Sequence, residues 1–161
     1  MPGEPPAGAP PGRRFFVEFA TDEACPFDFL DDPVIVLFFA SWAFSLRFGA
    51  MHDLAQAAQR MQRKHHVELK PLLRYADRDI DDDGDRRELE RVWQDPAPLA
   101  ECCRAVAGAA ESAATEDAEL AGFLAGYDHL APRLRELAAM CDWAAGRPAG
   151  GAQVRLTFLL D

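Results

Sequence analysis

The longest apolar stretch of the chain lies between Pro33 and Arg47, and its pattern changes halfway along. Residues 34–39 are aliphatic, β-branched or aromatic without any alternation, which predicts a strand buried on both faces. From Ala43 to about Lys64, apolar residues recur at steps of three and four, which predicts an amphipathic helix. A strand that runs directly into a helix is typical of an α/β domain.

The segments on either side of this stretch predict further strands and helices. Residues 14–20 alternate between apolar and polar side chains well enough to form a strand. Residues 67–75 fit either a strand or a short helix, because Pro71 would remove a hydrogen-bond donor from a strand ladder. After an acidic loop, a helix is predicted again over residues 86–93.

The C-terminal half of the chain is rich in alanine and is predicted to be helical. Three helices are expected, over residues 99–113, 115–126 and 132–146. Thr115 would cap the second helix and Gly146 would end the third. The third helix would bury a stripe formed by Leu134, Leu137, Ala138 and Cys141. Residues 154–160 alternate and predict a terminal strand, which must join the sheet or a partner's edge because a lone strand is unstable.

Together these elements predict one helix-rich α/β domain over residues 14–161, preceded by a disordered tail over residues 1–13 that is rich in proline and glycine. Residues 14–95 would form the α/β core, and residues 96–161 would form a helical extension that ends in the terminal strand. The alternative is a mainly-α bundle, in which residues 34–64 form one long buried helix.

Composition narrows the classes of partner and location. Hydrophobic residues make up 49% of the chain, which is enough for a core, and 17 basic against 27 acidic residues give a net charge of −10. Such a surface repels phosphate backbones, so nucleic acid is not an expected partner. The uncharged run 34–46 is shorter than the ~18 residues typical of a membrane span, and residues 1–12 lack the apolar core of a signal peptide. A cytoplasmic protein without a membrane contact is expected.

The four cysteines form no Cys-x-x-Cys pair. Cys102, Cys103 and Cys141 fall in alanine-rich helical segments, where a thiol usually acts as a small core residue. Cys25 precedes a proline in a predicted loop and is expected to be the most exposed. An enzyme that depends on one of these thiols is one of the functional alternatives.

The run Phe-Phe-Ala-Ser-Trp at residues 38–42, followed by Arg47 and Met51, resembles the active-site segment of thioredoxin-like proteins. The likeness is to thiol-disulfide oxidoreductases of the cytochrome-maturation type, in which Cys-x-x-Cys follows the tryptophan. The two cysteine positions are occupied here by Ala43 and Leu46. The chemistry of the family requires a thiolate of low pKa and a resolving thiol, so the resemblance implies a member without redox activity.

This resemblance covers about residues 33–93 and implies a thioredoxin-like core within the α/β part of the chain. It also implies a degenerate active-site groove, formed by Trp42, Ala43, Phe44, Ser45, Leu46 and Arg47. A groove with an exposed aromatic side chain and no thiols is suited to binding. The function expected from the resemblance is that of a redox-inactive binding or regulatory module with a protein partner and no cofactor.

An acidic segment provides a second functional hypothesis, a calcium-binding helical protein. Residues 79–90 match the EF-hand loop pattern, in which alternating carboxylates and a final glutamate surround one Ca²⁺. The candidate ligands are Asp79, Asp81, Asp83, Asp85 (through its carbonyl) and Glu90. Against this hypothesis, Arg86 occupies a position that is normally apolar, and the sequence has no second loop to pair with the first.

Two further pairs, Arg47 with His52 and Arg60 with His65, match the Arg-x4-His pattern of HEPN ribonucleases. Two matches in one predicted helix show that the pattern arises easily. The acidic net charge argues against an RNA substrate.

Overall fold

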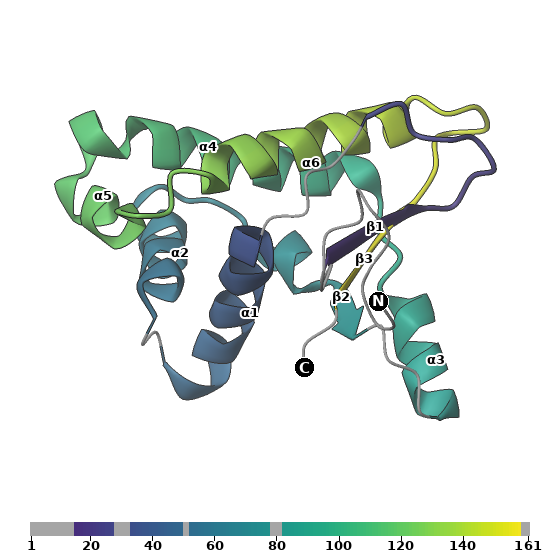
Figure 1. The fold of residues 1–161 in the computed structure, drawn as a ribbon, viewed down its shortest axis with the longest axis horizontal. Coiled ribbons are helices and arrows are strands. Elements are labelled where there is room, and N and C mark those ends of the chain that lie inside the picture. The colour runs from purple at the N-terminus through teal and green to yellow at the C-terminus, as the bar shows by residue number, and fades with distance from the viewer. Residues whose placement is uncertain (1–14, 28–32, 50–51, 78–81, 159–161) are drawn as a thin grey trace, which may run out of the picture.

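The computed structural model describes residues 15–27, 33–49, 52–77 and 82–158 (Figure 1). These residues form a helix-rich α/β fold with six α-helices, one short 3-10 helix and a three-stranded mixed sheet. The elements in chain order are β1 (Phe15–Phe19), α1 (Pro33–Phe48), α2 (Asp53–Lys64), the 3-10 helix η1 (Lys70–Leu73), β2 (Tyr75–Asp77), α3 (Asp83–Arg91), α4 (Pro96–Glu116), α5 (Ala118–Leu124), α6 (Leu130–Ala145) and β3 (Val154–Phe158). The helices α4 and α6 run side by side along one edge of the molecule (Figure 1). The predicted tail lies outside the described residues.

The first and the last described strands pair with each other in the sheet, whose strand order is β1-β3-β2. Strand β3 lies in the middle, antiparallel to β1 with Phe15 opposite Phe158, and parallel to β2 with Tyr75 opposite Leu156. The strands predicted at 14–20 and 154–160 are therefore confirmed over β1 and β3. The terminal strand pairs within its own chain and supplies the central strand of the sheet.

The predicted strand over residues 34–39 is wrong, because this segment is the first half of helix α1. The helix starts at Pro33, a residue that suits the first turn of a helix. Its buried residues are Val34, Ile35, Phe38, Phe39 and Trp42. They follow the three-and-four spacing of a helix, but Leu37 and Phe44 on the opposite side are also apolar and hide that period in the sequence. A continuous apolar run does not distinguish a strand from a buried helix.

Helix α1 also removes the structural premise of the resemblance to thioredoxin-like proteins. That resemblance required a strand to end at Trp42 and a helix to begin after it, whereas the chain is helical from Pro33 to Phe48. The resemblance therefore carries no further argument about function.

The predicted continuous helix up to Lys64 is divided into α1 and α2. Gly49 has a φ of +91°, a left-handed conformation that glycine adopts without strain and that commonly ends a helix. His52 then caps α2, because its Nδ1 accepts a hydrogen bond from the backbone N–H of Leu54 at 3.0 Å. No single helix in the described ranges is long and apolar enough to cross a membrane. Counted together, α1 and α2 satisfy that criterion, with a bend of 76° between them.

The remaining predictions differ from the structure mainly at element boundaries. Of the two alternatives for residues 67–75, the short helix is nearer to the structure, because Lys70–Leu73 form η1 with Pro71 in its first turn and β2 begins only at Tyr75. Thr115 belongs to α4, and Asp117 caps α5 in its place by accepting a hydrogen bond from the N–H of Leu120 at 3.2 Å. The predicted stripe of α6 is buried in full, and Gly146 ends that helix as predicted.

One hydrophobic core joins residues from β1 to β3 and includes parts of α1, α2, α4 and α6. Its aromatic centre surrounds Phe39, whose ring centroid lies 6.1 Å from that of Phe15, 5.8 Å from that of Phe158 and 6.3 Å from that of Tyr75. Residues 34–39, which the sequence predicted to be a buried strand of the sheet, therefore pack against the sheet as part of helix α1. A small separate cluster of Ala76, Leu89 and Val92 anchors α3.

Candidate functional site

The six residues of the predicted groove all lie in the second half of α1, but they do not share one face. Trp42 is buried in the core, whereas Phe44, Leu46 and Arg47 are exposed to solvent. The hydroxyl of Ser45 donates a hydrogen bond to the carbonyl of Trp42 at 2.6 Å and so stays on the helix itself. Trp42 is therefore not the exposed aromatic residue that the groove hypothesis required.

The acidic segment is only partly within the described residues, because Asp79 and Asp81 lie outside them. Asp82 caps α3 by accepting a hydrogen bond from the N–H of Asp85 at 2.9 Å. Asp83 and Asp85 both belong to the first turn of α3. Glu90 lies near the end of α3, with Oε1 3.7 Å from a guanidinium nitrogen of Arg155. Among the residues that the structure describes, no group of three or more His, Cys, Asp or Glu side chains could hold a metal ion.

The cysteines in the helices are core residues, as predicted. Cys102, Cys103 and Cys141 are buried, while Cys25 is half-buried. Burial raises the pKa of the Cys102 and Cys141 thiols to about 12, and it raises the pKa of Cys103 well above its ordinary value. Because the thiolate is the reactive form, these three thiols are poorly suited to nucleophilic or redox chemistry.

Arg60 and His65, one of the two Arg-x4-His pairs, meet at the carboxylate of Asp117. Nε of Arg60 donates to both carboxylate oxygens, at 2.8 and 2.7 Å, and Nε2 of His65 lies 2.9 Å from Oδ2. The hydrogen bonds from Arg60 and then from His65 hold the pKa of Asp117 well below its ordinary value. Since Asp117 also caps α5, this cluster fastens the end of α2 to the start of α5. Arg47 and His52 lie on opposite sides of the break between α1 and α2.

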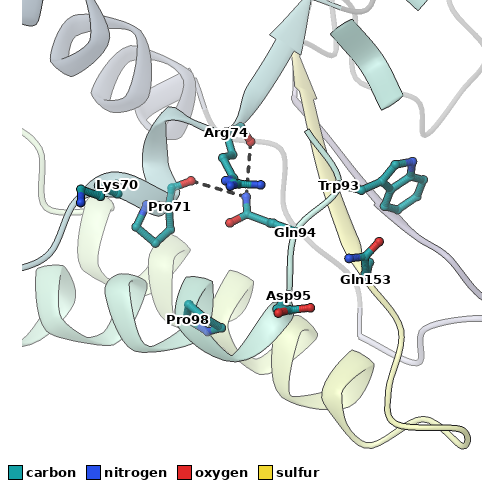
Figure 2. A pocket seen from close by; sticks show the side chains of 8 residues that line it. All are labelled: Lys70, Pro71, Arg74, Trp93, Gln94, Asp95, Pro98 and Gln153. Carbon is teal, nitrogen blue, oxygen red and sulfur yellow. Dashed lines mark hydrogen bonds between the residues drawn. The ribbon is translucent and has the colours of Figure 1, made fainter. Parts of the chain in front are cut away.

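A pocket of about 290 Å³ opens where η1, the turn between α3 and α4, and the start of β3 come together (Figure 2). Its lining residues are Lys70, Pro71, Arg74, Trp93, Gln94, Asp95, Pro98 and Gln153. They come from three segments that are far apart in the sequence. The backbone of Gln94 joins two of these segments, because its N–H and C=O both pair with Val154 at 2.9 Å.

The side chain of Gln94 is held in one orientation within this pocket. The residue is only 6% exposed, and its Nε2 donates to the carbonyls of Pro71 at 3.4 Å and Arg74 at 3.3 Å. Since both neighbours on that side are acceptors, the nitrogen of the carboxamide must face them and the oxygen must face away. Figure 2 shows the oxygen directed into the space between η1 and α4, and no described residue donates a hydrogen bond to it. The pocket thus contains an acceptor with a fixed orientation.

Charged side chains surround this acceptor. Lys70 and Arg74 lie on the side of η1, and Asp95 lies at the start of α4 (Figure 2). None of the three forms an ion pair with another described residue. The indole of Trp93 points away from Gln94, toward the rim, where the guanidinium carbon of Arg155 lies 4.5 Å from its ring centroid. The pocket therefore offers cations, a carboxylate and a neutral acceptor within a small volume.

Sequence reasoning missed this pocket because its residues carry no motif. Gln94 is a single polar residue between a helix and an Asp-Pro pair, and nothing local shows that its carboxamide is buried. Only the carbonyls of Pro71 and Arg74, some twenty residues earlier, give that side chain its orientation. Comparison of the chain with protein-family models, curated proteins and solved structures finds no match.

Proposed function

We propose that the protein is a non-catalytic binding module that holds a small amino-acid-like ligand in the pocket around Gln94. The observation that carries this proposal is the orientation of Gln94, a residue only 6% exposed, whose Oε1 has no hydrogen-bond donor among the described residues and is directed into the pocket. Ligand pockets typically combine an enclosing wall with a few fixed polar groups that orient the ligand. A ligand N–H or O–H would be the natural partner of this oxygen.

The charges at the pocket indicate the class of ligand. Lys70 and Arg74 suit a carboxylate, and Asp95 suits an ammonium group. A zwitterion satisfies both signs at once, while Gln94 accepts a hydrogen bond from its amino or side-chain donor. The volume of about 290 Å³ is just below the usual range for ligand pockets, roughly 300–1,000 Å³, which favours a molecule of amino-acid size.

The cysteines support a module without thiol chemistry. The three thiols in the helices are buried and have raised pKa values. A binding or regulatory role thus remains the proposal, but it rests on the Gln94 pocket and no longer on a thioredoxin-like groove.

The proposal is tested by ligand-observed NMR and thermal unfolding with the twenty standard amino acids. At least one of them should bind. At a free concentration of 100 times Kd, binding adds about 2.7 kcal/mol to the free energy of unfolding. For a chain of this size that raises Tm by about 5–11 °C.

Variants at the pocket then decide where the ligand binds. Lys70→Ala and Arg74→Ala should each weaken binding about tenfold or more, since both side chains are exposed and their loss should leave the fold intact. Arg87→Ala is the matched control, because Arg87 is an exposed cation of α3 outside the pocket. Absence of binding by all twenty amino acids, or equal effects of all three variants, would refute the proposal.

A further inference from the structure

The outward side of α1 has three exposed apolar side chains, with the half-buried Ser41 between the first and the second of them. Leu37, Phe44 and Phe48 are 38%, 53% and 61% exposed. Their spacing of seven and four residues places them on one side of the helix, opposite the side that enters the core. The rings of Phe44 and Phe48 lie 4.6 Å apart and form a continuous surface. We call Leu37, Phe44 and Phe48 the outer face of α1.

From this geometry we infer that the outer face of α1 is the contact surface of a symmetric dimer formed by two copies of the chain. A two-fold axis brings the same patch of both copies together, so each copy buries the apolar side chains of the other. This inference is independent of the ligand proposed for the Gln94 pocket.

The exposed area suits a weak dimer. If a Phe side chain offers roughly 200 Å² for burial, then Phe44 and Phe48 leave roughly 230 Å² exposed, and Leu37 raises the total to about 300 Å². The apolar part of one side of a standard interface is about 450 Å², which is somewhat more than half of ~800 Å². The outer face therefore supplies the centre of an interface, and the dimer is expected to be reversible.

The charge distribution favours contact at this face over other parts of the surface. The chain has a net charge of −10, so most of its surface repels a second copy. Helix α1 contains no carboxylate, and Arg47 is its only charged residue. Arg47 has no ion pair among the described residues and lies over the ring of Phe48, with its guanidinium carbon 5.6 Å from the centroid.

Charge also selects the orientation of the two helices. A parallel arrangement would place the two copies of Arg47 next to each other. In an antiparallel arrangement they lie near opposite ends of a helix that is roughly 24 Å long, well beyond the screening length of about 8 Å at physiological ionic strength. Phe48 of one copy then lies beside Leu37 of the other.

The test is sedimentation velocity of the full chain from micromolar to millimolar concentration. The wild type should change reversibly from monomer to dimer within this range, as weak interfaces of this size do. Phe44→Glu should raise the dissociation constant by about tenfold or more, since it places like charges in the centre of the contact. Circular dichroism checks that the helical content is unchanged.

Leu46→Glu is the matched control on the same helix. Leu46 is 54% exposed, almost the same as Phe44, but two residues away on a helix it points to nearly the opposite side. The control should change the dissociation constant by no more than about twofold. A wild type that stays monomeric, equal effects of the two variants, or a monomer that co-sediments with zwitterionic lipid vesicles would overturn the inference.

Discussion

Replacement of Phe39 by alanine should destabilise the protein strongly, because this ring is the point at which α1 meets the sheet. Phe39 is fully buried, and its ring lies within 6.4 Å, between centroids, of the rings of Phe15, Phe38, Tyr75 and Phe158. Truncation of a buried phenylalanine to alanine costs about 3–5 kcal/mol, through lost transfer free energy and the cavity that remains. For a chain of this size the expected decrease in Tm is about 6–20 °C.

Phe44→Ala is the control of identical chemistry on the same helix. Phe44 is about half exposed, so its truncation should change the free energy of unfolding by about 0.5 kcal/mol or less. Leu37→Ala adds a test of conformation. A strand buried on both faces would make this substitution as costly as that of Phe39. In α1 the Leu37 side chain is 38% exposed, so its truncation should cost less.

The measurement is urea unfolding followed by circular dichroism, at a protein concentration low enough to keep the chain monomeric. Equal slopes against urea for all variants would show that each free energy refers to the same unfolded state. Phe39→Leu, which leaves a smaller cavity, gives a measurable value if the alanine variant is too unstable to fold. The reasoning fails if Phe39→Ala costs less than about 1 kcal/mol, or no more than Phe44→Ala.

Three further predictions follow from the contacts of the fold. Asp117→Asn should lower Tm at neutral pH. The pKa of Asp117 is lower in the native state than in the unfolded state, so its carboxylate stabilises the fold at pH values above the unfolded-state pKa, and this stabilisation is lost as the pH falls toward the native-state pKa. A Tm difference between wild type and variant that persists unchanged at acid pH would contradict this prediction. In the native protein a thiol reagent should modify Cys25 first, and should modify Cys102, Cys103 and Cys141 only when the chain unfolds. Rapid modification of all four cysteines, measured by mass spectrometry, would be inconsistent with the burial of the three thiols in the helices. Calorimetric titration with Ca²⁺ should give no heat of binding, because α3 begins at Asp83 and residues 83–90 are therefore helical instead of forming a loop around an ion. Heat of binding that disappears in the Glu90→Gln variant would restore the calcium hypothesis.

Strand β3 and helix α6 show where sequence patterns were sufficient. In β3, the alternating apolar residues Val154, Leu156 and Phe158 are all buried, as the pattern predicts. Thr157 is buried as well, because β3 is the central strand. Helix α6 was predictable for a similar reason, because its buried stripe is bordered by charged residues. In both cases a single apolar face gives the pattern a clear period.

Helix α1 shows where the same reasoning fails. It is apolar on the side that faces the core and also on its outer face, so its sequence has no period by which to recognise it. The EF-hand pattern was inconclusive for a different reason: carboxylates at the correct spacing arise readily in an acidic chain, and Asp82 acts as a helix cap.

By itself, the sequence determined a helix-rich α/β chain with strands near both ends, an alanine-rich helical half and buried cysteines, because each of these features depends on local pattern and composition. Only the tertiary structure decided that residues 34–39 are helical, that β3 is the central strand, and that Gln94 directs its oxygen into a pocket. These properties depend on contacts between segments far apart in the chain, where the free energy of burial and of hydrogen bonding to distant carbonyls outweighs local preference.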